Sequence, residues 1–313
     1  MISVCMGTYN GEKYISQQLE SIFRQTAAPD EVVLCDDGST DGTVEVIRSF
    51  VEKHGLEGKW KLFLNEKNKG YPENFYYAMS LCTGDIVFLA DQDDIWDIHK
   101  VENMCGVLEK HPEAKAVCCK FGLVDAEGGH LHSIMAPART NGTKQVRNVG
   151  IDGVFYKCEW PGMVLAYRRE WFAGLWSGYA GQAGIPHDFL VCAWAAEEGG
   201  FLQLDEELAY HRRHDNNAGG EEHRIARLLN RERKLKEIDD YIRILDAFGN
   251  EEVLHTAHGK ESLMEKTATM KARREALVSG KAVKVAKNAW NNRKNVRLMT
   301  AVCDVAIALR GRK

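Results

Sequence analysis

The chain has 313 residues, of which 44% are hydrophobic and 27% charged, and its formal net charge is -4 at pH 7. This composition is typical of a globular protein and excludes a disordered or fibrous chain, and the small negative charge gives no sign of nucleic-acid binding. A chain of this length can form one large core with a smaller appendage.

The cysteines and the N-terminus indicate a reducing compartment. Nine cysteines, with no C-x-x-C pair, lie mostly in apolar runs, so we expect reduced thiols in the core. The chain opens directly into the apolar residues 2–6 without a basic start or a cleavage site, which predicts a cytoplasmic protein. No apolar run approaches the roughly 18 residues that a membrane span requires, so any membrane contact is expected to be peripheral.

Short apolar runs alternate with helical patterns through the first 123 residues. Pro72 suits the first turn of one of these helices, and Gly55 suits the end of another. The alternation predicts an α/β fold, a doubly wound and mostly parallel sheet. The expected strands are residues 2–6, 31–35, 61–64, 86–90 and 116–123, and the expected helices are residues 12–25, 43–54, 72–82 and 98–110.

The pattern changes twice further along the chain. Residues 125–148 lose their regular period and are expected to be irregular or to form a hairpin, as an insertion on the acceptor side. After residues 217–220 the apolar spacing is helical nearly to the end, which predicts a separate helical appendage. Between these two parts we expect a strand, two helices and a short strand, at residues 164–168, 169–176, 187–197 and 201–204.

The appendage is basic, whereas the preceding part is acidic. Residues 221–313 carry 21 Lys and Arg against 13 Asp and Glu, and residues 271–313 carry 12 against 2. Leu298, Val302 and Leu309 fall on one helical stripe. Two interpretations have equal weight: a helix in a membrane interface, or a helix packed on the catalytic domain or on another subunit.

Polar and acidic residues follow three of the expected strands. They are Thr8-Tyr9-Asn10, Asp36-Asp37 and Asp91-Gln92-Asp93-Asp94. Ligands of open parallel sheets bind beyond the carboxyl ends of the strands, and carboxylates gathered there repel one another unless a cation is present. Oxygen ligands suit Mg²⁺ or Mn²⁺, which bridges to substrate phosphates, so a nucleotide diphosphate is the expected ligand. The alternative for Asp91–Asp94 is an acidic loop that caps the following helix.

Taken together, residues 3–12, 36–43 and 83–96 resemble glycosyltransferases of family 2. The resemblance implies a GT-A, Rossmann-like catalytic domain over about residues 1–217, followed by the helical, basic C-terminal region of residues 218–313. Its nucleotide-sugar half is expected at about residues 1–123 and its acceptor half at about 124–217. The implied reaction is metal-dependent transfer of a sugar from a nucleotide diphosphate to an acceptor hydroxyl.

The resemblance assigns roles to residues in the nucleotide-sugar half. Asp37 is expected to contact the base, Asp91 the ribose and Asp93 the metal, and Gln92 departs from the commonest all-acidic motif. The residues implied to bind the nucleotide sugar are Thr8, Tyr9, Asn10, Glu12, Asp37, Asn68, Gly70, Asn74, Asp91 and Arg212; those implied to bind the metal are Asp93, Asp91 and His214. Arg212 or Arg213 would neutralise the departing diphosphate, and a solvated basic loop is the alternative.

The acceptor half contributes the expected general base. Asp188 would take the proton of the acceptor hydroxyl and give an inverting reaction, or it would only cap a helix. Trp160 and Gly162 are expected beside the acceptor, where the Trp ring would stack on a sugar. The alternative there is a turn with a half-buried Trp.

The DQDD-Ile-Trp form of the motif is similar to bacterial surface-polysaccharide transferases, many of them rhamnosyltransferases. It implies dTDP-rhamnose or a UDP-hexose as donor and a saccharide or a lipid-linked saccharide as acceptor, and it leaves a homodimer open. Two other functions compete. A nucleotidyltransferase would need a Gly-rich phosphate loop, which residues 8–12 lack. A non-catalytic sugar-nucleotide-binding scaffold would not need Asp91, Asp93, Asp188 and His214 together.

Overall fold

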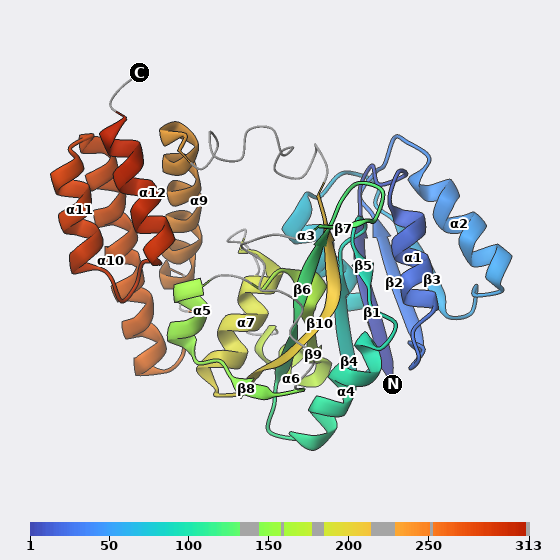
Figure 1. Ribbon diagram of the computed structural model, residues 1–313. Coiled ribbons are helices and arrows are strands. Elements are labelled where there is room, and N and C mark those ends of the chain that lie inside the picture. The colour runs from blue at the N-terminus through green and yellow to red at the C-terminus, as the bar shows by residue number, and fades with distance from the viewer. Residues whose placement is uncertain (132–143, 158–159, 177–184, 214–228, 251–252, 311–313) are drawn as a thin grey trace. The chain divides into compact units, whose positions relative to one another are not determined.

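The computed structural model describes residues 1–131, 144–157, 160–176, 185–213, 229–250 and 253–310 (Figure 1). These residues form two compact units, one of residues 1–149 and 159–213 and the other of residues 150–158 and 214–313. The helix α5 (Ile151–Lys157) belongs to the helical unit, although it lies within the segment of residues 1–217 expected for the catalytic domain.

The first unit is built on one sheet, and this confirms the predicted mostly parallel α/β fold. Its path runs β3-β2-β1-β4-β9-β6-β10-β5, with β7 beside β6 and β8 beside β10. The first four strands of this path are parallel, whereas β9 runs antiparallel to both β4 and β6. The strands are β1 (Ile2–Thr8), β2 (Glu31–Asp36), β3 (Trp60–Leu64), β4 (Ile86–Ala90), β5 (Ile95–Trp96), β6 (Ala116–Val124), β7 (His130–Leu131), β8 (Val146–Asn148), β9 (Leu165–Arg168) and β10 (Phe201–Arg212).

Helices cover this sheet, and two of them begin or end at the proline and the glycine that predicted those ends. Gly55 ends α2 in the left-handed conformation, at φ 63°, and Pro72 occupies the first turn of α3. All six residues of β2 are buried, as expected for a central parallel strand that is covered on both faces. The helices are α1 (Ile15–Phe23), α2 (Thr43–His54), α3 (Tyr71–Leu81), α4 (Lys100–Lys110), α6 (Arg169–Trp176) and α7 (His187–Glu197), and Gly162–Val164 form a 3₁₀ turn.

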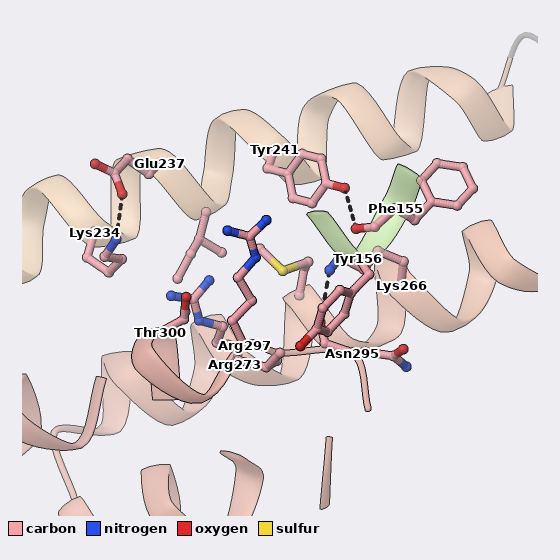
Figure 2. Close-up of a pocket in the computed structure, with 13 residues that line it drawn as sticks. Phe155, Tyr156, Lys234, Glu237, Tyr241, Lys266, Arg273, Asn295, Arg297 and Thr300 are labelled. Carbon is pink, nitrogen blue, oxygen red and sulfur yellow. Dashed lines mark hydrogen bonds and ion pairs between the residues drawn. The ribbon is translucent and has the colours of Figure 1, made fainter. Parts of the chain in front are cut away.

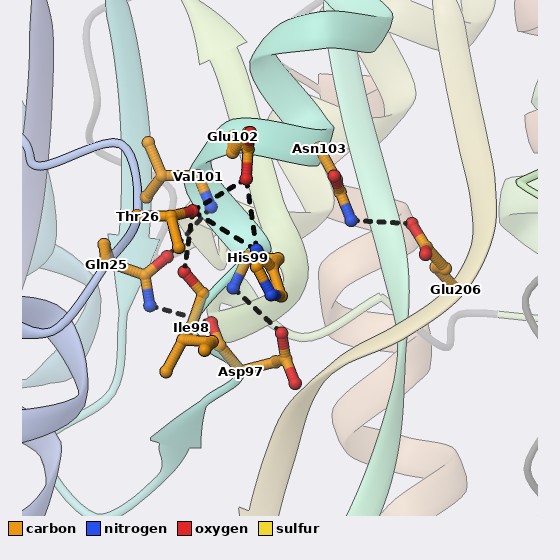
Figure 3. A network of polar contacts seen from close by, with 9 residues as sticks. All are labelled: Gln25, Thr26, Asp97, Ile98, His99, Val101, Glu102, Asn103 and Glu206. Carbon is orange, nitrogen blue, oxygen red and sulfur yellow. Dashed lines mark hydrogen bonds and ion pairs between the residues drawn. The ribbon is translucent and has the colours of Figure 1, made fainter.

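Polar contacts attach the end of α1 to the start of α4 (Figure 3). The buried Gln25 side chain donates to the carbonyl of Asp97 at 2.7 Å and accepts the N–H of Val101 at 3.0 Å. The hydroxyl of Thr26 donates to the carboxylate of Glu102 at 2.8 Å. These bonds fix the segment that directly follows the acidic residues 91–94.

The last strand of the first unit is longer than predicted. The sequence predicts a strand only at residues 201–204, but β10 continues to Arg212 beside β6. Its register shifts between Gln203 and Glu207 and again between Glu207 and Ala209. Because the register shifts there, the polar residues 205–207 interrupt the regular pairing without ending the strand. The strand therefore continues to His211 and Arg212, which lie beside the end of β6.

The second unit is helical, as predicted. Its long helix α9 (Arg231–Asn250) buries one apolar stripe, which contains Ile238, Ile242 and Leu245. Besides α5, the described part of this unit also contains α10 (Ala257–Ser279), α11 (Ala282–Asn291) and α12 (Leu298–Leu309). Arg273 of α10 and Asp304 of α12 form a buried two-bond ion pair, with distances of 2.6 and 2.9 Å. No helix within the described ranges is long and apolar enough to cross a bilayer.

The described cysteines are all free thiols, and all but Cys303 are buried. Burial raises the pKa of several of them, including Cys35 and Cys105, each to about 12. These buried, protonated thiols fit the expected core role.

Candidate functional site

The polar segments that follow β1, β2 and β4 meet at one edge of the sheet, as the parallel register requires. Thr8 pairs with Asp36, and Met6 pairs with Ala90, so the three strands end side by side. The hydroxyl of Thr8 donates to Asp36 at 2.9 Å, and both side chains are buried. Thr8 therefore joins two strand ends, while the next residue, Tyr9, is 49% exposed.

The amide of Gln92 joins the loops after β1 and β4. Its oxygen accepts the N–H of Tyr9 at 2.9 Å, and its nitrogen donates to the carbonyl of the same residue at 2.9 Å. A Cβ atom on Gly11 would overlap this amide. A carboxylate at position 92 would lack the donor, so the departure from the all-acidic motif has a structural reason here.

Asn10 and Glu12 hold the loop that follows β2. The Asn10 side chain accepts the N–H of Thr40 at 2.8 Å, and Glu12 accepts the N–H of Gly42 at 2.9 Å. Asn10 itself has a left-handed backbone, with φ 49°. Both residues lie at the predicted edge, and the contacts seen here are with backbone amides of the protein.

Asp37 is the centre of a second loop contact. Its buried carboxylate accepts the N–H groups of Lys69 and Gly70 at 2.8 and 2.9 Å, and its carbonyl accepts the side chain of Asn68 at 2.9 Å. Asn74 is also buried and donates to a carbonyl of β2 at 2.9 Å. The structure thus brings together four residues that were expected to bind the nucleotide sugar, Asp37, Asn68, Gly70 and Asn74. The carboxylate of Asp37 fixes the loop that contains residues 68–70.

The acidic residues after β4 share a strained electrostatic environment. Burial and the charges of Asp94, Asp93 and Asp188 raise the pKa of the Asp91 carboxyl well above its usual range, and His211 partly opposes the rise. Mutual repulsion of this kind is what a bound cation relieves. Asp188 contributes to this rise together with Asp93 and Asp94.

Asp94 is held by the end of β10, a role that the sequence did not reveal. One of its oxygens accepts the backbone N–H of Arg212 at 3.0 Å and lies 3.1 Å from Nδ1 of His211. Burial would lower the pKa of His211, but the hydrogen bond and the charge of Asp94 raise it overall. The other oxygen of Asp94 is buried and has no hydrogen-bond partner among the described residues. Asp94 and His211 thus form an ion pair behind the acidic edge, which is the end of the sheet that carries Asp91 and Asp93.

The guanidinium of Arg212 is buried and donates mainly to backbone carbonyls. Nε donates to the Asp93 carbonyl at 2.7 Å, Nη1 to the Ala126 carbonyl at 2.8 Å, and Nη2 to the Gln17 side chain at 2.5 Å. Sequence reasoning expected this side chain to face the diphosphate. In the structure it is fully enclosed and braces the acidic segment from behind, because β10 runs further than predicted.

Arg212→Met is expected to destabilise the protein, on the order of 3 kcal/mol, because it leaves several buried carbonyls without donors. Chemical denaturation of the variant measures the change. Arg213→Met is the matched control, since Arg213 is the next residue and is exposed. Equal, small losses in both variants would contradict the bracing role.

Asp188 occupies the first turn of α7 beside a buried histidine. Burial raises the pKa of its carboxyl to about 6, and the backbone N–H groups of Phe189, Asp188 and Gly162 oppose the rise. Its neighbour His187 stacks on Phe75 with 4.0 Å between ring centroids, and burial lowers its pKa to about 3. A Cβ on Gly162 would lie 2.9 Å from Nε2 of His187, so glycine permits this close approach. The environment suits a carboxylate that exchanges a proton near neutral pH.

Trp160 lies in the core of the first unit. Its ring packs edge-on against Phe201 at 5.4 Å, its N–H lies 3.3 Å from the Gln203 side-chain oxygen, and only 9% of the residue is exposed. The alternative interpretation was a turn with a half-buried Trp, and the structure buries this ring further than that, in contact with Phe201 and Gln203.

Lys100 is a further residue of the site that sequence reasoning missed. It is fully buried, donates to the Met163 carbonyl at 2.5 Å, and lies 3.4 Å from the ring centroid of Trp96. Burial lowers its pKa to about 7, while the charges of Asp94 and Asp91 oppose the fall. Its place on the apolar stripe of α4, with Met104 four positions on, was the available signal.

Only two of the three expected metal ligands, Asp91 and Asp93, lie within the described residues. His214 lies outside the described residues, and the described part contains no group of three or more His, Cys, Asp or Glu side chains poised around one ion. Asp91 and Asp93 nevertheless fit Mg²⁺ or Mn²⁺, because such ions use one or two carboxylates together with water and substrate phosphates. The raised pKa of Asp91 fits the same conclusion.

Comparison with known proteins agrees with this geometry. Residues 3–172 match the family model described as "Glycosyl transferase family 2". The relative "Putative glycosyltransferase EpsE" of Bacillus subtilis is 34% identical over 116 residues, which are 37% of this chain and 41% of that protein. The matched regions of the first relatives range from 41% to 66% of those proteins' own lengths.

Two solved structures share the fold. S. aureus TarS 1-349 in complex with UDP superposes with a TM-score of 0.59 at 16% identity, covering 98% of this chain and 90% of that one. The mannosyltransferase PcManGT of Pyrobaculum calidifontis, in complex with GDP-Man and Mn²⁺, gives a TM-score of 0.54 at 20% identity, covering 99% and 86%. At these identities the likeness concerns the fold.

Proposed function

Because the chain belongs to glycosyltransferase family 2, we propose that it transfers a sugar from a nucleotide diphosphate donor to an acceptor hydroxyl with inversion at the anomeric carbon. The observation that carries the proposal is the place of the start of α7 beside the end of β4, because a Cβ on Gly162 would lie 2.9 Å from Nε2 of His187 and 3.7 Å from Cβ of Leu89, two residues before Asp91. A proton-accepting carboxylate thus lies beside the carboxylates that suit a metal and a diphosphate.

In the proposed reaction Asp188 acts as the general base. It accepts the proton of the acceptor hydroxyl as the oxygen forms a bond to the anomeric carbon, while the bond from that carbon to the diphosphate oxygen breaks with its electron pair. A pKa of about 6 leaves Asp188 ionised at neutral pH yet basic enough to take the proton. Attack from the face opposite the diphosphate inverts the configuration.

Asp91 and Asp93 would hold the metal, with His214 as a candidate further ligand. A divalent cation, when bound, would neutralise charge on the leaving diphosphate. The loops braced by Asp37 and Gln92 would position the nucleotide, because both side chains fix backbone segments at the edge.

We propose dTDP-rhamnose or a UDP-hexose as donor and a saccharide, free or lipid-linked, as acceptor in bacterial polysaccharide synthesis. The UDP complex of the TarS structure supports a uracil nucleotide, and the DQDD-Ile-Trp motif supports the rhamnosyl alternative. The Mn²⁺ in the PcManGT complex supports a metal cofactor.

The proposal includes peripheral membrane contact through the second unit. Large apolar side chains are exposed on α11 and α12, with Trp290 at 70%, Leu298 at 78% and Leu309 at 71% exposure. Exposed basic residues, including Lys287 and Lys294, accompany them. This mixture suits an anionic bilayer surface, and co-sedimentation with anionic vesicles checks the contact.

A panel of UDP-, dTDP- and GDP-sugars with Mn²⁺ tests the proposed function. Thermal shift reports donor binding, and slow release of free nucleoside diphosphate reports hydrolysis of the bound donor. A selective donor is the expected result. If no donor binds with or without Mn²⁺, the transferase proposal fails. A donor that binds but never releases nucleoside diphosphate, even with acceptors present, would favour the sugar-nucleotide-binding scaffold.

A further inference from the structure

An exposed aromatic ring at the start of α3 takes no part in the hydrogen bonding of the fold. Tyr71 is 52% exposed, and its hydroxyl makes no hydrogen bond within the described residues. In the helical unit, by contrast, the hydroxyl of Tyr241 joins α9 to α5, because it donates to the Phe155 carbonyl at 3.0 Å beside a pocket of about 430 Å³ (Figure 2). Single exposed aromatic residues are common, so the neighbours of Tyr71 decide what it does.

The residues on either side of Tyr71 fix its backbone. Gly70 has φ 85°, a conformation that favours glycine, and its N–H donates to the Asp37 carboxylate at 2.9 Å. Pro72 follows in the first turn of α3, where its ring presets the helical backbone. The position of Tyr71 is therefore set before a ligand arrives, which lowers the cost of ordering it on binding.

The ring of Tyr71 rests on two buried aromatic side chains. Its centroid lies 5.7 Å from that of Phe75 and 5.4 Å from that of His187. Those two rings stack on each other, with 4.0 Å between centroids and 12° between planes, and both residues are buried. Tyr71 is thus supported on one side by packed rings, and the rest of its surface is left for solvent or a ligand.

The same ring lies between the two parts of the proposed site. It follows the loop that Asp37 holds, and it contacts His187, the residue before the proposed general base. The hydroxyl of Tyr76 also donates to the Ile185 carbonyl at 2.9 Å, which holds α3 against the segment before α7. In the proposed reaction, the sugar lies between the nucleotide and the attacking hydroxyl. Tyr71 occupies the corresponding place, between the nucleotide loop and the base.

We propose that Tyr71 binds the sugar of the donor, with the flat face of its ring against the sugar ring. This inference rests on the proposed transfer reaction and adds a residue to which the motifs assign no role. A tyrosine ring offers a large apolar face and a polar tip, which suit the C–H face and the hydroxyls of a hexose or deoxyhexose. Partial burial and the charges of Asp188 and Asp91 raise the pKa of the Tyr71 hydroxyl, so it stays protonated and can donate to a sugar oxygen.

The test separates the contribution of the sugar from that of the nucleotide. Calorimetric titration of the whole chain with Mn²⁺ measures the affinity for UDP-glucose and for UDP, or for the corresponding dTDP or GDP pair that the donor panel selects. The ratio of the two affinities isolates the sugar. Tyr71→Ala is expected to lower this ratio about tenfold and to leave the affinity for UDP unchanged. Tyr71→Phe keeps the ring and should change the ratio by less than about twofold.

Phe23→Ala is the matched control. Phe23 is also an exposed ring that packs on a phenylalanine and a histidine, with its centroid 6.0 Å from that of Phe50 and 4.5 Å from that of His54. Phe50 stacks on Trp60, the first residue of β3, so this cluster lies at the opposite end of the strands from the acidic edge. The control should leave both affinities unchanged.

Thermal unfolding without ligand verifies the fold of each variant. If Tyr71→Ala loses stability, Tyr71→Leu gives the same comparison, because leucine covers the buried rings without offering a flat face. A lower ratio in Tyr71→Ala that is absent from Tyr71→Phe and from Phe23→Ala supports the proposal. An equal fall in Tyr71→Phe would assign the contact to the hydroxyl and contradict stacking.

Steady-state kinetics with the acceptor complete the test. If the ratio is unchanged and only the KM for the acceptor rises in Tyr71→Ala, the ring serves the acceptor and the donor assignment is wrong. If the affinity for UDP falls as much as that for UDP-glucose, Tyr71 shapes the nucleotide loop, and the proposal is again wrong. A Tyr71→Ala chain that behaves as the parent does refutes this inference and leaves the proposed transfer intact, whereas a parent chain that binds no donor removes both.

Discussion

Asp188→Asn is expected to lower turnover by about 10²- to 10⁴-fold, the usual contribution of a general base, while leaving donor affinity unchanged. Asparagine keeps the shape of the side chain but accepts no proton from the acceptor. Steady-state kinetics with the selected donor and acceptor give the rate, and a donor titration by thermal shift gives the affinity. An equal loss of donor affinity would mean that Asp188 binds the donor.

Glu170→Gln is the matched control for Asp188→Asn. Glu170 is an acidic residue in the first turn of α6, as Asp188 is in the first turn of α7. If a charge at a helix start were all that mattered, both substitutions would cost about 0.3–1 kcal/mol of stability and little activity. We expect Glu170→Gln to retain normal turnover.

The pH profile gives an independent view of the same residue. The pKa of Asp188 is raised to about 6, so the carboxyl is ionised above that pH and protonated below it. Since the base acts in its ionised form, activity should rise with pH through about 6 and then level off. The inflection should disappear from the residual activity of Asp188→Asn; an unchanged inflection would assign it to another group.

Asp93→Ala is expected to reduce metal-dependent donor affinity by at least about tenfold, equivalent to about 1.4 kcal/mol, because it removes a carboxylate ligand of the ion. Donor titrations with and without Mn²⁺ measure the change.

Asp97→Ala is the control for Asp93→Ala. Asp97 lies in the same segment, but its carboxylate accepts the N–H of His99 at 2.9 Å, away from the acidic edge. This variant should keep its Mn²⁺ dependence. An unchanged Mn²⁺ dependence in Asp93→Ala would place the ion elsewhere.

The sequence predicted some elements to the residue because local chemistry marks their ends. The helices at residues 43–54, 169–176 and 187–197 were expected with the bounds that α2, α6 and α7 have. Gly55 marks the end of α2, since glycine adopts the left-handed conformation that ends a helix. Pro186 marks the start of α7, since proline is favoured where a helix begins.

The predicted end of β10 was wrong because the alternation of apolar and polar residues is a poor guide across an irregular strand. Residues 205–207 interrupt the apolar pattern, and only pairing with β6, which depends on residues far away in sequence, extends the strand beyond them. Because the strand was predicted too short, the buried position of Arg212 was not predicted either. A basic residue assumed to lie in a loop was expected to meet phosphate, whereas the end of a buried strand encloses it.

The segments of the candidate site were predictable, but the use of each side chain was not. Parallel strands bring Thr8, Asp37 and Asp91 to one edge, and the motif spacing shows this. Whether Asn10 or Asp37 turns toward a ligand or toward neighbouring backbone amides depends on loop conformations without a sequence period. The same holds for Lys100, whose burial follows from helix packing.

The contacts of Arg212 have a consequence for the order in which the protein is made. Asp94 and the carbonyl of Asp93 obtain partners from His211 and Arg212, more than 110 positions later in the chain. During synthesis the acidic segment emerges from the ribosome long before these partners. The carboxylates would then remain loosely held until the final strand of the first unit arrives, so a nascent or truncated chain that stops before residue 211 would have the motif without its fixed geometry.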